Sequence, residues 1–218
     1  MRVLLRFEKG NEVKYISHLD MQRLFQRALR RAKLPCAYSQ GFNPHLLISF
    51  AAALPVGVCS DAEFVEFQLT KFIHPLEVMK RLNEVMPKGV KILNAIEPEE
   101  SFPNVGSVIA LAEYAFTTKN GDDYSKALKD ILAQEEITIE KKAKKGFALV
   151  NVRPMIHRLT QNGEVIKATL SCSNSENLRA DKMAEILSCN GISVASIKRT
   201  SILICIDGFI KEPLGVNK

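Results

Sequence analysis

The chain has 218 residues, of which 46% are hydrophobic and 25% charged. This is the composition of a globular protein with a buried core, and it argues against intrinsic disorder. The formal net charge of +6 permits attraction to polyanions. Charges interrupt the apolar run at the start and no later stretch is long and apolar enough to cross a bilayer, so we expect neither a signal peptide nor a membrane helix.

The first hundred residues carry alternating strand and helix patterns. We expect strands over residues 2–8, 46–50, 64–69 and 90–96. We expect one helix between Ser17 and Pro35 and a second over residues 74–86. The order strand, helix, strand, strand, helix, strand is typical of the split βαβ, or ferredoxin-like, plan.

The first helix is the clearest element in the sequence. Ser17 is suited to cap it, and Asp20 lies in its first turn near the positive end of the helix dipole. Apolar residues recur at three- and four-residue spacing: Leu19, Leu24, Phe25, Ala28 and Leu29. The opposite face gathers four arginines: Arg23, Arg27, Arg30 and Arg31. The pattern therefore predicts a strongly basic stripe.

A polar segment follows this helix. Residues 38–45 read Tyr-Ser-Gln-Gly-Phe-Asn-Pro-His, where glycine permits a positive φ and the Asn-Pro pair discourages helix. We expect an ordered loop that adjoins the arginine stripe.

The second half roughly repeats this order after an acidic, proline-bearing stretch at residues 97–104. We expect strands over residues 114–118, 137–142, 147–152, 164–171 and 192–206, and helices over 122–134 and 177–188. The sequence therefore predicts an α+β protein made of tandem ferredoxin-like (split βαβ) units with antiparallel sheets. The expected division is a first unit at 1–98, a linker at 99–108 and a second unit at 109–218. A single larger α+β sheet is the alternative.

The five cysteines are scattered, odd in number and without a Cys-x-x-Cys pair: Cys36, Cys59, Cys172, Cys189 and Cys205. Zinc sites and iron–sulfur clusters usually draw their ligands from close local pairs or triplets, so we expect no metal site and no cofactor. We expect these cysteines to be small buried hydrophobic residues of a cytoplasmic protein.

The basic helix and the polar loop form the main candidate for binding. Arginine donates two parallel charged hydrogen bonds to a phosphate, and aromatic rings stack on unpaired bases. The candidate RNA-contacting residues here are Arg23, Arg27, Arg30, Arg31, Gln40, Phe42, Asn43 and His45. The simpler interpretation is that the arginines solvate one face of an amphipathic helix and Phe42 fills the core.

A second basic stretch, at residues 141–146, joins two expected strands and precedes Arg153. Lys144, Lys145 and Arg153 are further candidates for RNA binding, because lysines on a loop add phosphate affinity without sequence preference. If both halves face the same way, one basic cleft results.

Three residues are candidates for acid–base catalysis: His18, Asp20 and His45. Helix capping and the helix dipole explain the first two more simply. The common phosphate-binding, Rossmann, zinc-protease and serine-hydrolase motifs are absent from the sequence.

Several motifs resemble the radical-SAM-linked protein family, a family of unknown function. They are Tyr15 to Asp20, Arg27 to Ala32, Gly41 to His45, Leu54 to Val58, Val152 to Ile156 and Lys198 to Thr200. The resemblance covers most of the chain. Two positions depart from the family pattern: Leu46 stands where proline is usual, and Asn151 where an aspartate precedes the Arg-Pro pair.

This resemblance implies a partnership with a separate B12-binding-type radical-SAM protein in an RNA-related setting. The sequence lacks the Cys-x-x-x-Cys-x-x-Cys motif, so the partner would hold any cluster. Our leading hypothesis is an auxiliary RNA-binding protein that serves tRNA or rRNA modification or processing. The alternatives are an autonomous RNA-processing or RNA-modifying enzyme, and a protein-interaction module whose arginines meet an acidic partner.

Overall fold

The computed structural model describes residues 1–143 and 146–214. The strands are β1 (Arg2–Lys9), β2 (Ile48–Phe50), β3 (Cys59–Gln68), β4 (Val90–Ile96), β5 (Ile109–Thr118), β6 (Thr138–Ala143), β7 (Gly146–Asn151), β8 (Ile156–Asn162), β9 (Val165–Ser171), β10 (Val194–Ile206) and β11 (Phe209–Lys211). The helices are α1 (His18–Arg31), α2 (Pro75–Asn83), α3 (Val105–Val108), α4 (Ser125–Ala133) and α5 (Ala180–Cys189).

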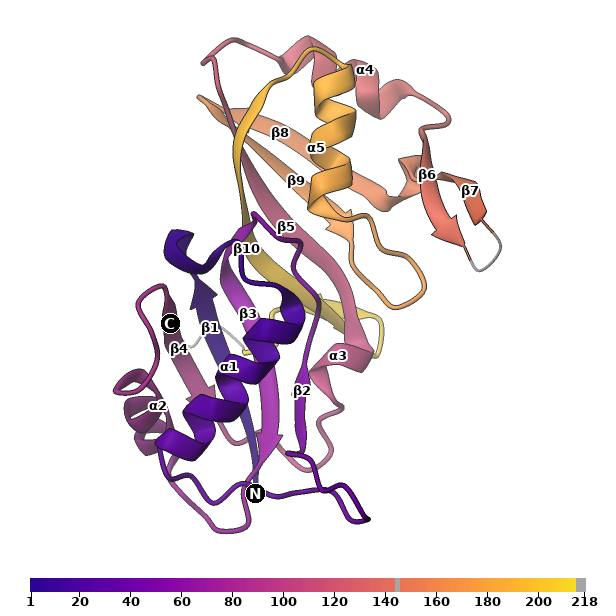
Figure 1. The fold of residues 1–218 in the computed structure, drawn as a ribbon. Coiled ribbons are helices and arrows are strands. Elements are labelled where there is room, and N and C mark those ends of the chain that lie inside the picture. The colour runs from indigo at the N-terminus through magenta and orange to yellow at the C-terminus, as the bar shows by residue number, and fades with distance from the viewer. Residues whose placement is uncertain (144–145, 215–218) are drawn as a thin grey trace.

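One nine-stranded sheet runs through the whole molecule (Figure 1). Its strand order is β4-β1-β3-β10-β5-β9-β8, with β2 beside β3 and β11 beside β10. All of these pairs are antiparallel except β3 and β10, which pair in parallel at Cys59 with Lys198 and at Ser60 with Arg199. The predicted α+β class is confirmed, but the expected antiparallel sheets are joined into one large mixed sheet.

The joining strand is β10, which is 13 residues long. One of its edges pairs with β5 over most of its length, and the other edge is met by the beginning of β3. Strand β10 therefore joins the strands of the two halves into one sheet.

Two hydrophobic cores lie against this sheet. Alternate residues of a strand point to opposite faces, so Val3, Leu5 and Phe7 of β1 pack with α1 and α2 in one core. Leu4 points the other way and belongs to a larger core that also contains Phe116 and the buried sides of α4 and α5. The larger core thus draws side chains from both halves, while Figure 1 shows α1 and α5 in front of their respective parts of the sheet.

Most predicted elements are present, with shifted ends. The strand over residues 90–96 matches β4, and the Ser17-capped helix matches α1. By contrast β8, α3 and β11 were not predicted. In β8 a β-bulge places the buried residues Ile156 and Leu159 three positions apart, which hides the alternation typical of a strand.

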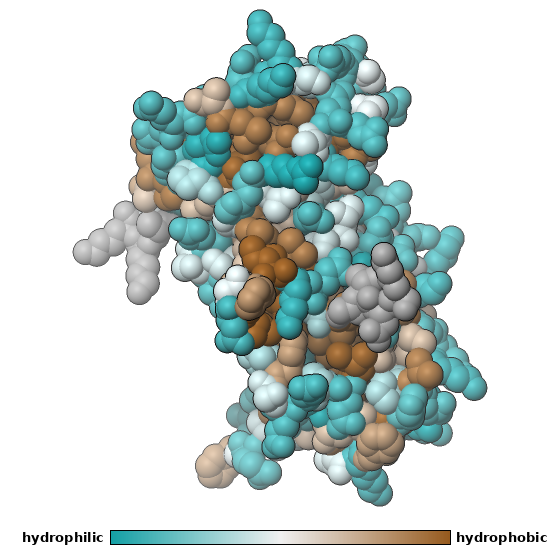
Figure 2. Space-filling model, turned by 180° about the vertical axis from the view of Figure 1, so that it is seen from behind, coloured by the Kyte–Doolittle hydropathy of each residue, from teal (hydrophilic) through white to brown (hydrophobic). Residues whose placement is uncertain are grey.

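The expected strands over residues 137–142 and 147–152 form β6 and β7, a two-stranded hairpin outside the main sheet. Seen from behind, most of the molecular surface is hydrophilic, and apolar side chains gather in the upper part and near the middle (Figure 2). No helix in the part of the chain that the structure describes has the length and apolar character needed to cross a membrane. The division into units at 1–98 and 109–218 stays a prediction.

Candidate nucleic-acid interface

Helix α1 begins at a serine cap, as its sequence predicts. The Ser17 hydroxyl accepts a hydrogen bond from the backbone N–H of Asp20 at 3.2 Å and donates one to the Asp20 carboxylate at 2.7 Å. Arg23 Nη1 lies 2.9 Å from the other carboxylate oxygen. These hydrogen bonds, first that of Ser17 and then that of Arg23, lower the pKa of Asp20. The start of the helix is therefore firmly held.

The two faces of α1 differ sharply. Met21, Phe25, Ala28 and Leu29 are buried in the core. All four predicted arginines are exposed: Arg23, Arg27, Arg30 and Arg31. Among the residues that the structure describes, only Arg23 of these four takes part in an ion pair, and that pair with Asp20 is itself exposed. The guanidinium groups of Arg27, Arg30 and Arg31 are thus accessible to a ligand from solution.

Three of the arginines line a groove between α1 and the turn that follows α2. The groove has a volume of about 580 Å³. Its lining residues are Tyr15, Ile16, Asp20, Arg23, Leu24, Arg27, Ala28, Arg31, Val85 and Pro87. The helical spacing of four residues explains why Arg23, Arg27 and Arg31 share this side, about 6 Å apart along the axis.

A second hollow of about 430 Å³ continues from the first and shares Arg31 and Val85 with it. It is lined by Arg31, Ala32, Lys33, Glu77, Lys80, Arg81, Glu84 and Val85. We call the two hollows together the α1–α2 groove. Six basic and three acidic side chains line it, and two of the acidic ones pair with Arg23 and Arg81. The groove therefore carries a net positive charge along α1.

Tyr15 lies at the edge of this groove and is 73% exposed. Its backbone is held on both sides: Gly57 N–H donates to the Lys14 carbonyl at 2.9 Å, and Ile16 N–H donates to the Val13 carbonyl at 3.0 Å. The Lys14 ammonium lies 5.2 Å from the ring centre. The sequence alone does not predict a binding role for Tyr15, because the exposure of a single tyrosine leaves no pattern in the sequence.

Hydrogen bonds close the polar loop at its base. Ser39 N–H donates to the His45 carbonyl at 2.8 Å, and the Ser39 hydroxyl is 2.8 Å from His45 Nδ1. Gly41 has a φ of +123°, which a residue with a side chain rarely adopts. Phe42 is fully exposed at the tip rather than in the core, and Gln40 and Asn43 are exposed beside it.

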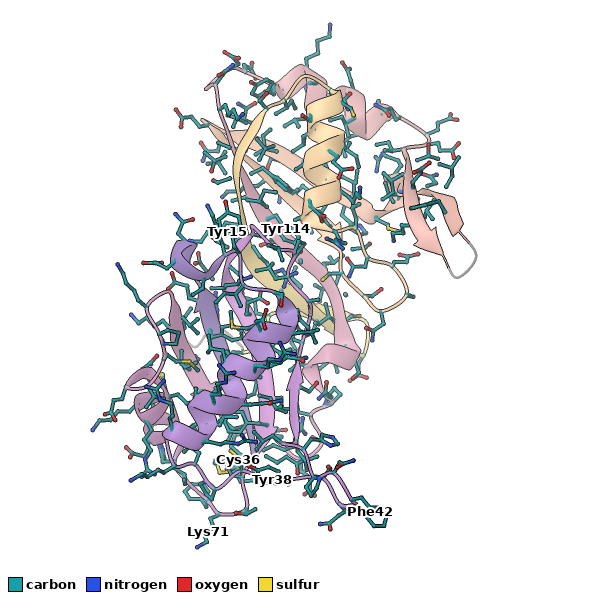
Figure 3. The ribbon with its side chains drawn as sticks, in the orientation of Figure 1. Tyr15, Cys36, Tyr38, Phe42, Lys71 and Tyr114 are labelled. Carbon is teal, nitrogen blue, oxygen red and sulfur yellow. The ribbon has the colours of Figure 1, made fainter. Side chains whose placement is uncertain are left out.

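Tyr15 and Phe42 lie at opposite ends of the first half (Figure 3). His45 lines a third hollow with residues of β2 and β3, whereas no residue of this loop lines the α1–α2 groove. The part of the groove at Tyr15 is therefore distant from the tip of the loop. A role of Gln40, Phe42, Asn43 and His45 in RNA binding stays a prediction.

The second basic stretch has a different environment. The Lys141 ammonium donates to the Asn177 carbonyl at 2.9 Å, while Lys144 and Lys145 lie outside the described residues. Arg153 donates to the carbonyls of Leu132 and Ile156, with a shortest distance of 2.6 Å. This arrangement fixes Arg153 against the end of α4. The β6–β7 hairpin projects from the second half far from α2 (Figure 1), and a role of Lys144, Lys145 and Arg153 in RNA binding stays a prediction.

The Asn151 carboxamide, at the position where the sequence departs from the family pattern, is used internally. Its oxygen accepts hydrogen bonds from the backbone N–H groups of Ile137 at 3.1 Å and Arg153 at 3.0 Å. An aspartate could accept the same two bonds, so the substitution keeps this local structure.

The three catalytic candidates have different surroundings. Asp20 lines the α1–α2 groove and His45 the third hollow. His18 packs edge-on against Phe50, with ring centres 5.6 Å apart, and its Nε2 is 3.0 Å from the Gln22 amide nitrogen. Burial lowers the pKa of His18, which favours a neutral imidazole at pH 7. A catalytic role of His18, Asp20 and His45 stays a prediction.

A buried polar cluster, which the sequence did not reveal, lies where β3, β10 and β5 meet. Arg199 Nη1 is 2.8 Å from the Glu63 carboxylate, and its Nε donates to the Tyr114 hydroxyl at 3.1 Å. Burial by itself lowers the pKa of Arg199, but the Glu63 carboxylate raises it above its usual value, so the residue stays charged. Lys9 is also buried nearby and donates to the Ile16 carbonyl, and burial lowers its pKa.

A further hollow of about 570 Å³ lies over β5, β8, β9 and β10 and carries two exposed cations, Arg158 and Lys167. No cluster of three histidine, cysteine or acidic side chains placed to hold a metal ion occurs within residues 1–143 and 146–214.

Comparison with known proteins gives one family. A family model described as "Uncharacterized protein conserved in bacteria (DUF2344)" matches residues 2–180. No curated protein matches the sequence. A solved structure described as "Crystal Structure of a Cbf5-Nop10-Gar1 Complex" is similar with a TM-score of 0.47 and 8% sequence identity, covering 92% of this chain and 48% of that one. The protein thus spans about half the length of the chain that it matches. At this TM-score and identity the similarity does not indicate a shared function.

Proposed function

The chain belongs to the DUF2344 family, and we propose that it binds RNA through the α1–α2 groove. The observation that carries this proposal is the row formed by Arg23, Arg27 and Arg31, which is exposed, lines one groove and leaves two of its three guanidinium groups without an ion pair among the described residues.

Surface arginines that only solvate a helix are commonly matched by nearby carboxylates at helical spacing. On α1 the single carboxylate, Asp20, is engaged by Ser17 and Arg23, so Arg27 and Arg31 remain for an external anion. A planar guanidinium binds two oxygens of one phosphate, and a row of them follows a phosphate backbone.

We further propose that the protein is an auxiliary, non-catalytic subunit in the cytoplasm. In this proposal it presents tRNA or rRNA to a separate radical-SAM protein that carries out the modification or processing. The radical-SAM partner rests on the family resemblance of the motifs alone. Asp20 and His45 line different hollows, which supports a non-catalytic role.

We interpret each half as a ferredoxin-like unit within the common sheet. The order β4-β1-β3 with β2 beside β3, and the order β10-β5-β9-β8, support this interpretation. Without the β6–β7 hairpin and β11, each half has four strands, and its first strand lies between its fourth and its third.

Filter binding of total RNA tests the proposal. Wild type is compared with the double variant Arg27→Ala/Arg31→Ala, and with Arg158→Ala/Lys167→Ala, which removes two exposed cations from the hollow over β5, β8, β9 and β10. We expect the first variant to bind at least about tenfold more weakly at moderate salt and the second to bind as wild type does. Equal affinity of the first variant and wild type would reject the groove as the RNA site.

Two further assays separate the alternatives. RNA that is cleaved or changed in mass by the purified chain alone would establish an autonomous enzyme. Co-purification with a radical-SAM protein that survives nuclease treatment but fails for Arg27→Ala/Arg31→Ala would assign the arginines to protein contact instead.

A further inference from the structure

We propose that the α1–α2 groove takes a single-stranded segment of RNA and that Tyr15 stacks on one of its bases. This inference rests on the proposed RNA binding and adds the class of substrate. It follows from the combination, in one groove, of a row of guanidinium groups with an exposed aromatic ring.

The first step is the spacing of the cations. Arg23, Arg27 and Arg31 are one helical turn apart, so their side chains start about 6 Å from each other along the axis. This spacing is similar to that of successive phosphates along one strand. Lys33, Lys80 and Arg81 extend the basic track beyond Arg31. The groove therefore suits one phosphate backbone of a few nucleotides that runs along α1.

The second step is the state of Tyr15. A tyrosine on a globular surface usually buries much of its ring, but Tyr15 is 73% exposed. The backbone on either side of it is held, because the Lys14 carbonyl accepts a hydrogen bond from Gly57 and the Ile16 N–H donates one to Val13. An ordered, exposed ring costs little conformational entropy when it captures a flat ligand. Tyr15 is thus pre-formed as a stacking platform at the edge of the groove.

The third step excludes a duplex. Bases of a double helix are stacked inside it, and their faces cannot reach a ring on a protein surface, whereas unpaired bases are free to turn toward one. A duplex bound to the arginines would leave Tyr15 without a partner. The aromatic ring next to the cationic row therefore favours a single strand.

The absence of tryptophan from the sequence gives a direct test. Tyr15→Trp introduces a single indole at the platform, which is excited selectively at wavelengths where tyrosine does not absorb, and Phe209→Trp introduces one at a control position of matched exposure, 74%, on β11. The probes are a 12-nucleotide RNA of mixed sequence, the same RNA annealed to its complement, and the DNA strand of the same sequence. Stacking of a base on the indole quenches its fluorescence, which binding elsewhere does not.

We expect the single-stranded RNA to quench Tyr15→Trp in a saturable way and to leave Phe209→Trp unchanged. In anisotropy titrations with labelled RNA, Tyr15→Ala is expected to bind the single strand about tenfold more weakly, and Tyr15→Phe to bind as wild type does. The duplex is expected to bind more weakly than the single strand and to be insensitive to Tyr15→Ala. The DNA strand measures how far the 2′-hydroxyl groups contribute.

The outcomes distinguish this inference from the proposal on which it rests. If Arg27→Ala/Arg31→Ala weakens RNA binding but Tyr15→Ala does not, or if the duplex binds as tightly as the single strand, the groove binds RNA and the single-strand inference is wrong. If no RNA form binds at all, both fail. Because Tyr15 is exposed, thermal unfolding of its variants is expected to match wild type, which excludes misfolding as the cause.

Discussion

Arg199 shows how one side chain joins distant parts of the molecule. It is 1% exposed, and it pairs with Glu63, which is 136 residues away in the sequence. Charges buried this deeply are destabilising unless every donor has a partner. Here the partners are Glu63, the Tyr114 hydroxyl and the Ala53 carbonyl.

Replacing Arg199 with methionine is expected to lower the free energy of unfolding by about 3–5 kcal/mol, because the Glu63 carboxylate is then left buried without a countercharge. Arg199→Met/Glu63→Gln is expected to recover part of this loss. Urea denaturation checks both. The control is Arg179→Met, which breaks an exposed pair with Asp181 and is expected to cost less than about 1 kcal/mol. A loss for Arg199→Met as small as that of the control would contradict this account of the buried cluster.

The cysteines differ in reactivity for a related reason. Burial raises the pKa of the Cys36 thiol to about 11, with the Arg30 charge opposing it only in part. At pH 8 the thiolate of Cys36 is therefore rare, and alkylation of the native protein is expected to be slow there and to accelerate as the pH approaches 11. Cys189 and Cys205 are exposed and are expected to react before Cys36. Peptide mass spectrometry after timed iodoacetamide treatment measures both, and equal rates at pH 8 would contradict the prediction.

At the scale of single residues, the sequence indicated the exposed arginines of α1 because helical spacing alone decides which face they occupy. It did not indicate Arg199 or Glu63, because a buried ion pair between strands far apart in sequence leaves no local pattern. It also did not separate Arg153, whose guanidinium is bound to backbone carbonyls, from arginines that are free to bind a ligand.

Among the elements, α1 carries the proposed function, and its start depends on one hydroxyl. Ser17→Ala removes the hydrogen bond accepted from the Asp20 N–H and is expected to destabilise the protein by about 1 kcal/mol. The matched control is Ser188→Ala on an exposed position of α5, where alanine is a better helix former and no loss is expected. Urea denaturation compares the two. An equal effect of both substitutions would show that the cap is not what stabilises the start of α1.

Local signals explain which elements were predictable. The limits of α1 are marked by Ser17, the apolar spacing and Pro35, and the predicted β4 has the observed ends. The hairpin of β6 and β7 has the local pattern of strands, yet it pairs only with itself, since pairing in a sheet is decided by long-range contacts. The bulge in β8 removed the alternation on which its prediction depended.

The whole molecule is held together by β10. The sequence predicted the order of elements in each half, but the parallel pairing of β3 with β10 joins residues about 140 positions apart, and no local pattern encodes it. The larger core likewise contains Leu4 and Phe64 from the first half with Phe116 and Leu187 from the second. A shared sheet and a shared core predict one cooperative unit.

Pulsed thiol labelling in increasing urea tests that prediction. Cys36 lies in the first half and the buried Cys172 in the second, so each reports the opening of its own half. We expect both to become reactive at the same urea concentration, in coincidence with the loss of secondary structure measured by circular dichroism. Two separate midpoints would show that the halves unfold independently and would contradict the joining role of β10.

The central claim is that guanidinium groups of the α1–α2 groove contact phosphates. The most direct test is the salt dependence of RNA binding for wild type and Arg27→Ala/Arg31→Ala, because each phosphate contact with a single strand contributes about −0.7 to the slope of log affinity against log salt. We predict a slope that is less steep by about 1.4 in the double variant. An unchanged slope, with both proteins folded, would contradict the account.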